Sequence, residues 1–95
     1  MAMEIQHDMQ AQKGVFYIQG ADKRSAEMSY VWAGTTKIII DHTEVGEELK
    51  GKGAGKLLLA AVVAFARTKN IKILPVCPFA KAIMEKTTEY SDVLF

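Results

Sequence analysis

The sequence predicts a mixed α/β fold of the α+β kind, with several strands, one main helix, a further strand and a short C-terminal helix. Three observations predict this fold class. Segments rich in β-branched and aromatic side chains dominate residues 15–45, as is typical of strands. A helical apolar stripe follows from residue 53, and a β-branched segment at residues 71–76 returns the chain to the sheet. The length of 95 residues, with 49% hydrophobic side chains, predicts one domain over residues 1–95.

Three strands are expected in the first half of the chain. The first, at residues 15–19, ends in a Gly-Ala-Asp turn. The second carries large side chains at every other position of residues 28–32, which is the alternation of a half-buried strand. After a reversal at residues 34–36, the third strand runs over residues 38–45, and its three consecutive isoleucines suit a central strand covered on both faces. A further short strand is expected near residues 3–7.

A long amphipathic helix is expected over residues 53–70. Basic residues in its last turn and Asn70 at the C-cap mark its end. The following strand should therefore pair in parallel through a right-handed crossover, with Pro75 limiting it to one partner near its end. Pro78 suits the first turn of a closing helix that runs to about residue 88. The apolar stripe of the long helix consists of Leu57, Leu58, Ala61, Val62, Phe65 and Ala66.

Charge and composition exclude several classes of protein. The formal net charge of +1 gives no basis for nonspecific binding, so neither nucleic acid nor a membrane is expected as a partner. The longest uncharged apolar segment, residues 57–66, has ten residues, whereas a membrane-spanning helix needs about 20. Residues 1–10 lack the pattern of a secretory signal, so a cytoplasmic location is expected. Because Cys77 is the only cysteine, an internal disulfide and a thiolate zinc site are excluded, and no metal is expected.

The charges are distributed unevenly along the chain. Residues 1–48 hold four basic and eight acidic side chains, a balance of −4. Residues 49–95 hold eight basic and three acidic side chains, a balance of +5. A small anion is therefore expected to bind to the second half.

The second half begins with a Gly-rich segment that has the properties of an anion site. Residues 50–56 read Lys-Gly-Lys-Gly-Ala-Gly-Lys and lie between a strand and the long helix. The glycines let the backbone approach a ligand, and the free amides, the helix dipole and three lysines attract negative charge. Gly53 replaces the Ser or Thr of a P-loop, and Lys56 replaces the third Gly of the dinucleotide fingerprint. The alternative is a loop whose glycines only turn the chain and whose lysines only contact solvent.

The same segment matches the pattern Q/R/K-x-x-G-x-G/A, and here the chain resembles the GNAT superfamily of N-acetyltransferases. Their pyrophosphate loop for coenzyme A has this form and this placement. Residues 42–45 (HTEV), 74–79 (LPVCPF) and 89–92 (EYSD) make the chain similar to the small single-domain GNAT-like acetyltransferases, over roughly residues 36–95. The resemblance departs at Lys50, where the superfamily more often has Gln or Arg. It implies a GNAT-like, mostly antiparallel sheet with a splayed parallel strand pair, and acetyl-CoA as cosubstrate.

Cys77 is the first candidate catalytic residue. It directly precedes Pro78, which places it near the N-cap of the closing helix, where free amides and the helix dipole would lower the pKa of its thiol. The small GNAT-like family carries a cysteine at this position that is regarded as a candidate active-site group. The alternative is a small buried residue at a strand end.

His42 and Glu44 are the other candidate catalytic residues. An imidazole titrates near neutrality and can accept a proton from an incoming amine, although histidines near strand ends are often only hydrogen-bonded. Strand alternation predicts that both side chains share one face with the preceding Ile38 and Ile40. The other face is then expected to hold Asp41, Thr43 and Val45.

The resemblance also implies the residues that bind the coenzyme. Glu44 and Val45 would line the acetyl and pantetheine arm, and a main-chain N–H near the strand end would polarise the thioester carbonyl. Phe79 and Lys81 would flank the coenzyme from the last helix. The pyrophosphate would lie on the loop formed by Lys50, Gly51, Lys52, Gly53, Ala54, Gly55 and Lys56.

The expected activity is acetyl transfer from acetyl-CoA to an amine of a small molecule or a protein. Either the amine attacks directly with His42 or a water as base, or Cys77 is acetylated first. A coenzyme A-binding module with little or no catalysis is the alternative, because the chain has no room for the helices that full-size GNAT enzymes place between their first two strands. A structural domain with an incidental Gly-rich loop is the third interpretation. The oligomeric state is left open.

Overall fold

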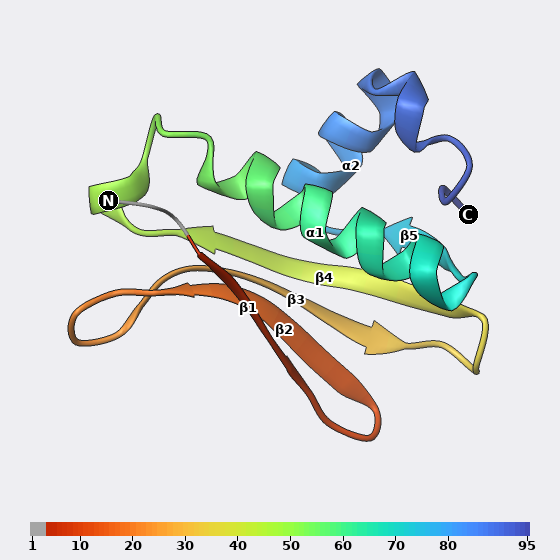
Figure 1. The fold of residues 1–95 in the computed structure, drawn as a ribbon. Coiled ribbons are helices and arrows are strands. Elements are labelled where there is room, and N and C mark those ends of the chain that lie inside the picture. The colour runs from red at the N-terminus through yellow and green to blue at the C-terminus, as the bar shows by residue number, and fades with distance from the viewer. Residues whose placement is uncertain (1–3) are drawn as a thin grey trace.

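A computed structural model describes residues 4–95, in which five strands form one sheet and two α-helices lie on the same side of it (Figure 1). The strands follow one another across the sheet in chain order. None of the helices in residues 4–95 has both the length and the apolar content that a membrane crossing requires. The elements are β1 (Ile5–Met9), β2 (Lys13–Gln19), β3 (Arg24–Trp32), β4 (Lys37–Val45), η1 (Glu47–Leu49), α1 (Ala54–Lys69), β5 (Lys72–Pro75), α2 (Pro78–Lys86) and η2 (Thr88–Tyr90).

The sheet is mixed and mostly antiparallel, as predicted. Strands β1 to β4 pair antiparallel, and β4 pairs with β5 in parallel through the crossover made by α1. The short strand expected near residues 3–7 is β1 at Ile5–Met9, and Met3 lies outside the described residues. The 3-10 helix η1 was not predicted from the sequence. It stands between β4 and the Gly-rich segment.

Helix α1 begins and ends where its local signals predict. Gly53 occupies the N-cap, and Asn70 occupies the C-cap in the left-handed conformation, with φ 58° and ψ 48°. Asn tolerates this conformation better than most residues, and its N–H bonds to the carbonyls of Ala66 and Arg67. Of the predicted apolar stripe of α1, Leu57 is 43% exposed, whereas the other five residues are buried or half-buried. The predicted amphipathic helix is therefore confirmed, except at Leu57.

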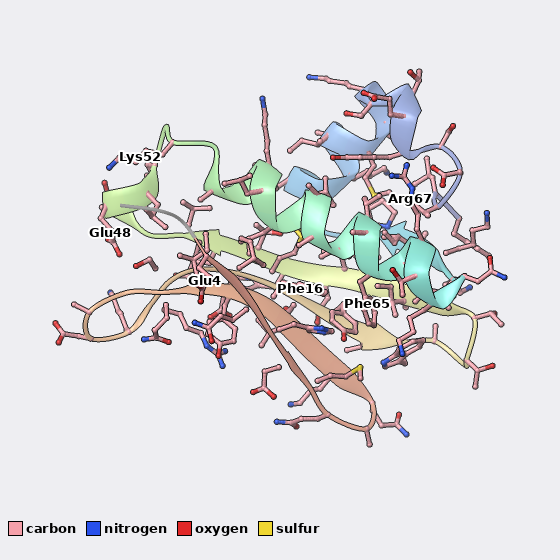
Figure 2. The ribbon with its side chains drawn as sticks, viewed as in Figure 1. Glu4, Phe16, Glu48, Lys52, Phe65 and Arg67 are labelled. Atoms are coloured by element: carbon pink, nitrogen blue, oxygen red, sulfur yellow. The ribbon has the colours of Figure 1, made fainter. Side chains whose placement is uncertain are left out.

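The core lies between α1 and one face of the sheet. Figure 2 shows Phe16 and Phe65 between the strands and the helix. Met28 and Tyr30 of β3 are 0% and 1% exposed, and Trp32 packs against this cluster. Tyr30 and Trp32 therefore both contribute to the core.

The opposite face of the sheet has no helix over it in residues 4–95 (Figure 1). Side chains on this uncovered face, such as Val15, Tyr17 and Glu27, are only half-buried. The connection between β1 and β2 is a tight turn, in which the Gln10 N–H donates to the Lys13 carbonyl over 2.8 Å. This connection therefore contains no segment long enough to cover the face.

A β-bulge interrupts β4 in the middle of the strand. Ser29 pairs with His42, whereas the next residue of β3, Tyr30, pairs with Ile40. Asp41 is therefore an extra residue without a register partner in β3, although its side chain accepts a hydrogen bond from Ser29 Oγ over 2.8 Å. One extra residue exchanges the two faces of a strand for every position beyond it.

The exchange changes the position of the candidate catalytic residues. Beyond the bulge, Thr43 and Val45 are half-buried on the helix side, and Thr43 pairs with the fully buried Met28. His42 and Glu44 are exposed on the uncovered face. The prediction that they share a face with the preceding isoleucines is wrong, because strict alternation holds only in a strand without a bulge.

Strand β5 forms one edge of the sheet, and its outer side is covered by the C-terminal segment. The Ile73 N–H donates to the Val93 carbonyl over 2.6 Å, and the Phe95 N–H donates to the Ile73 carbonyl over 2.8 Å. Pro75 pairs with Ile40 of β4, and within residues 4–95 the sheet has no further strand beyond β5. Its predicted restriction to one strand partner is confirmed.

Candidate functional site

The loop before α1 depends on two glycines in the left-handed conformation. Gly51 and Gly53 both have φ 78°, which side-chain-bearing residues rarely adopt. Apart from the glycine itself and its two neighbours in the chain, no atom of residues 4–95 lies within 4 Å of the position that a Cβ would take at either residue. The loop is therefore open on the side where these two residues would carry side chains.

The same loop leaves a group of backbone amides without partners. Within residues 4–95, no hydrogen-bond acceptor is found for the N–H groups of Gly51, Gly53, Ala54, Gly55 and Lys56. The N-cap Gly53 has no side chain to satisfy them. These donors begin a helix of 16 residues, so the positive end of its dipole adds to their attraction for an anion.

The lysines of the loop differ in their contacts. Lys50 donates from Nζ to Glu47 Oε1 over 3.0 Å, and both side chains are largely exposed. Such an exposed pair contributes little and competes weakly with a bound anion. No ion pair is found for Lys52 or Lys56 among the described residues. Figure 2 shows Lys52 close to Glu48 of η1, at the end of the molecule where the loop lies.

Gly55 has a different function from the two loop glycines. A Cβ at Gly55 would lie 2.3 Å from Cζ of Phe79, so the missing side chain makes room for the Phe79 ring. Gly55 and Ala54 are both buried by the protein itself. The missing side chain of Gly55 therefore allows α1 and α2 to approach each other, while Gly55 still lines the hollow described below.

A hollow of about 520 Å³ lies over the loop and the start of α1. Of the residues predicted to bind the coenzyme, the side chains of three lie elsewhere. Lys52 lines a neighbouring hollow with the β2–β3 turn, Lys81 lines a hollow beside β5, and Glu44 lines one on the uncovered face. The hollow over the loop is lined by Val45, Leu49, Lys50, Gly51, Gly53, Ala54, Gly55, Lys56 and Phe79.

The paired strands β4 and β5 separate beside this hollow. Their last pair is Ile40 with Pro75, and the N–H groups of Val76 and Cys77 both donate to the Ile40 carbonyl over 3.0 Å. Beyond this point β4 continues to Val45, whereas the other chain turns into α2. Beyond Ile40 and Pro75 the end of β4 and the N-terminus of α2 therefore diverge, and we call the space between them the splay.

Cys77 lies in this splay, at the N-cap of α2. It is 7% exposed, and its Sγ donates to Thr43 Oγ1 over 3.2 Å. Burial raises the pKa of the thiol, but the Thr43 hydroxyl and the main-chain N–H groups of Ala80, Phe79 and Thr43 together lower the pKa below its usual value. No capping hydrogen bond is closed at the N-cap side chain, so the helix amides act through charge–dipole attraction. The predicted N-cap position is confirmed.

Thr43 is a site residue that the sequence did not predict. Strand alternation placed it opposite His42 and Glu44, and only the position of Cys77 in the fold makes it a partner of the sulfur. The only signal in the sequence is its place in the HTEV segment, which does not say which of the four side chains points at the splay.

On the uncovered face, His42 Nε2 lies 3.7 Å from Glu44 Oε1. Glu27 is directly opposite Glu44 in β3. One ligand atom from each of the three side chains lies within 4.8 Å of the others, so one ion could contact all three. All three groups reach solvent, however, and their proximity alone does not assign a metal.

His7 has a structural role in the core margin. Its Nε2 lies 2.6 Å from the Tyr30 hydroxyl, and its ring stacks on Phe16 with the centroids 3.9 Å apart. Burial lowers the pKa of His7, although the carboxylate of Asp8 acts in the opposite direction. Burial also raises the pKa of Tyr30 to about 12. Both groups are therefore neutral in the folded protein at neutral pH.

Comparisons with known proteins identify a match over most of the sequence. The model of a family described as GCN5-related N-acetyltransferase matches residues 15–93. None of the curated proteins matches the sequence. The solution structure of a GCN5-like protein from Staphylococcus aureus, proposed to be an N-acetyltransferase, is 42% identical with a TM-score of 0.77. That match covers 98% of this chain and 88% of the other.

Longer acetyltransferases share the fold at lower identity. An aminoglycoside acetyltransferase from an uncultured soil metagenomic sample, solved with sisomicin, is 17% identical with a TM-score of 0.64 and matches over 83% of this chain and 59% of its own. The ribosomal-protein-alanine N-acetyltransferase of Brucella melitensis biovar Abortus 2308 is 15% identical with a TM-score of 0.65, over 81% and 62%. These likenesses show the fold alone, and the shared part leaves out more than a third of each longer enzyme.

Proposed function

The chain belongs to the GCN5-related N-acetyltransferase family, and we propose that it transfers the acetyl group of acetyl-CoA to an amine. The observation that carries this proposal is the set of unpartnered amides at the start of α1. They open into a hollow whose far wall is Phe79, two residues after Cys77. A pyrophosphate group supplies the negative charge that such donors attract. The acyl arm of the same molecule would reach the splay along Val45.

Each element of the site has a distinct task in this proposal. The loop at residues 50–56 binds the pyrophosphate through main-chain donors, and Lys50 and Lys56 add positive charge. Phe79 packs against the coenzyme from α2. Lys52 and Lys81, which line neighbouring hollows, remain candidates for contacts outside the hollow over the loop. A main-chain N–H at the end of β4 polarises the thioester carbonyl, as an oxyanion hole does.

Two routes of acetyl transfer are compatible with the positions of the candidate groups. In the direct route, an amine attacks the thioester carbonyl, the coenzyme thiolate leaves, and the amine proton passes to His42, Glu44 or a water. His42 and Glu44 lie on the uncovered face, so the amine would approach the splay from that side. In the covalent route, the Cys77 thiolate attacks the carbonyl and releases the coenzyme thiolate, and the amine then takes the acetyl group from Cys77.

A coenzyme A-binding module with little catalysis is the second candidate. The uncovered face of the sheet favours this candidate, because the β1–β2 connection is a tight turn and contributes no segment that could form an acceptor pocket on this face. Such a protein would bind acetyl-CoA as strongly as an enzyme does and transfer the acetyl group slowly or not at all. For either candidate we propose a cytoplasmic location, since the free Cys77 is suited to a reducing compartment.

Calorimetry with acetyl-CoA, followed by an assay of coenzyme A release, tests both candidates. We expect micromolar binding and release that depends on an added amine, from a panel containing free lysine, a polyamine, an aminoglycoside and a peptide with a free N-terminus. Binding without release across the panel favours the module. The absence of binding contradicts both candidates and leaves a structural domain.

The covalent route has its own test, since Cys77 is the only thiol in the chain. The protein is incubated with acetyl-CoA alone and its intact mass is measured. The covalent route predicts one added acetyl group in the wild type and none in Cys77→Ala. Unchanged turnover in Cys77→Ala, with no acetylated wild-type protein, would leave only direct transfer.

A further inference from the structure

A hydrogen bond bridges the splay at the place where β4 and α2 separate. Thr43 contributes the hydroxyl from β4, and Cys77 contributes the sulfur from the start of α2, with 3.2 Å between them. The strand pairing has already ended at Ile40 and Pro75. A side-chain contact therefore joins the two walls of the splay beyond the last backbone pair.

The bulge at Asp41 is what makes this contact possible. Without the extra residue, Thr43 would point to the uncovered face and His42 would point at the helices. The bulge places a neutral hydroxyl, rather than an imidazole, against the sulfur. A hydroxyl can accept a hydrogen bond from a thiol and, after rotation about its C–O bond, donate one to a thiolate.

In the described part of the chain, no other side-chain donor is found to act on the Cys77 sulfur. On β4, His42 and Glu44 project to the other face of the sheet. On the remaining elements, Lys56 of α1 and Lys81 of α2 line other surfaces, and Lys72 of β5 bonds to the Asp92 carbonyl. Among the described residues, the groups that act on the Cys77 sulfur are the Thr43 hydroxyl and main-chain N–H groups.

We propose that Thr43 is a positioning residue for Cys77, whose hydroxyl holds the sulfur in the splay and donates to it when the thiol ionises. This proposal rests on the proposed function for one step only, which is the attack of the thiolate on the acetyl group of acetyl-CoA. The stabilisation of the thiolate itself requires no coenzyme. It is a property of the folded protein and can be measured in the absence of any substrate.

Replacing the hydroxyl should reduce the thiolate population. A hydrogen bond to a charged group is stronger than a neutral one, so its loss should raise the midpoint of thiol ionisation by on the order of one pH unit. This corresponds to about tenfold less thiolate at a pH below the midpoint. Thr43→Val removes the hydroxyl and keeps the shape of the side chain. Thr43→Ser keeps the hydroxyl and removes a methyl group.

The experiment measures the rate of Cys77 alkylation by iodoacetamide as a function of pH, with intact mass as the readout. The midpoint of the profile reports thiolate stability, and the plateau at high pH reports access to the sulfur. We expect the midpoint to rise in Thr43→Val and to stay close to wild type in Thr43→Ser. An unchanged midpoint in Thr43→Val, or equal shifts in both variants, would overturn the proposal, since equal shifts indicate packing alone.

Two controls separate this result from misfolding and from the proposed function. Thermal unfolding of each variant checks the fold, and Thr43→Ala replaces Thr43→Val if the valine variant does not fold. The ultraviolet absorbance of the thiolate, taken as the difference between each protein and its Cys77→Ala counterpart, gives the same midpoint without dependence on reagent access. If acetyl-CoA acetylates the wild type, Thr43→Val should slow acetylation about tenfold with unchanged acetyl-CoA affinity. A wild type that is never acetylated contradicts the covalent route but leaves the midpoint test in force.

Discussion

The two ends of helix α1 are built in opposite ways. At the N-terminal end, five backbone amides have no acceptor among the described residues, and the loop glycines leave the space around them open. At the C-terminal end, Asn70 closes the helix, and Arg67 holds the C-terminal segment through Asp92 and the Glu89 carbonyl. Figure 2 shows Arg67 at this closed end, far along the helix from Lys52. Unsatisfied donors are costly unless water or a ligand meets them, so the open end is the one that suits binding.

Among the tests of this difference between the two ends of α1, replacing Gly53 by alanine should have the largest effect. Gly53→Ala places a Cβ at φ 78°, so the loop must change its conformation or bear about 1–2 kcal/mol of strain. We expect acetyl-CoA affinity to fall by at least about tenfold, as measured by calorimetry. Gly34→Ala is the matched control, because Gly34 has φ 76° and equally open surroundings in the β3–β4 turn. Equal losses of affinity in both variants would contradict a binding role for the loop.

Replacing Gly55 by alanine should reduce the stability of the folded protein. The Cβ of Gly55→Ala would lie 2.3 Å from the Phe79 ring, and such overpacking typically costs about 1–3 kcal/mol. Urea unfolding should show this loss, and the double variant Gly55→Ala/Phe79→Ala should not add the two single losses. Additive losses would mean that the ring and the helix do not meet in solution. Together, Gly53→Ala and Gly55→Ala thus distinguish a glycine needed for binding from a glycine needed for packing.

Replacing one lysine at each end of α1 tests whether positive charge contributes to binding only at the N-terminal end. Lys56→Gln should weaken acetyl-CoA binding a few-fold at low salt, and the difference from wild type should shrink as salt screens the charge. Lys69→Gln, in the last turn of the same helix, should leave the affinity unchanged. Calorimetry at two salt concentrations measures both effects. A similar loss in both variants would indicate a long-range effect of net charge and no local contact.

The interaction between Arg67 and Asp92 at the C-terminal end of α1 should affect the stability of the protein at acidic pH. The hydrogen bond from Arg67 lowers the pKa of Asp92 from its ordinary value of 3.8. The folded protein therefore holds the carboxylate more strongly than the unfolded chain, and the resulting stability is present above pH 3.8 and lost as the pH falls toward the folded pKa. Melting temperatures measured from about pH 5 downward should fall less steeply in Asp92→Asn. Parallel curves would mean that the pair contributes nothing to acid stability.

The predicted elements succeeded where the signals are local. The period of the apolar residues and the two caps determine α1, and the β-branched segments determine β2 to β5, because these preferences act within a few residues. The position of Cys77 at the N-cap of α2 follows from the neighbouring Pro78. The open backbone of the Gly-rich loop also follows from consecutive residues, and its use as an anion site stays a prediction.

The prediction failed at His42 and Glu44 because the bulge is not a local property. Asp41 becomes an extra residue only through the pairing of β3 with β4, and strand alternation read from β4 alone places every later side chain on the wrong face. The contacts of Gly55 and His7 are also between distant segments. Their partners, Phe79 and Tyr30, are 24 and 23 positions away in the sequence, and nothing near either residue in the sequence indicates the contact.

The sequence by itself determined the elements, the Gly-rich loop before α1 and the family to which the chain belongs, because each of these is encoded in short consecutive segments. The tertiary structure alone decided which side chains meet in the splay. Thr43 faces Cys77, and His42 faces the uncovered side, because one unpaired residue in β4 exchanges the faces of the strand. Register between strands is a relation between distant segments, and it exists only once the sheet has formed.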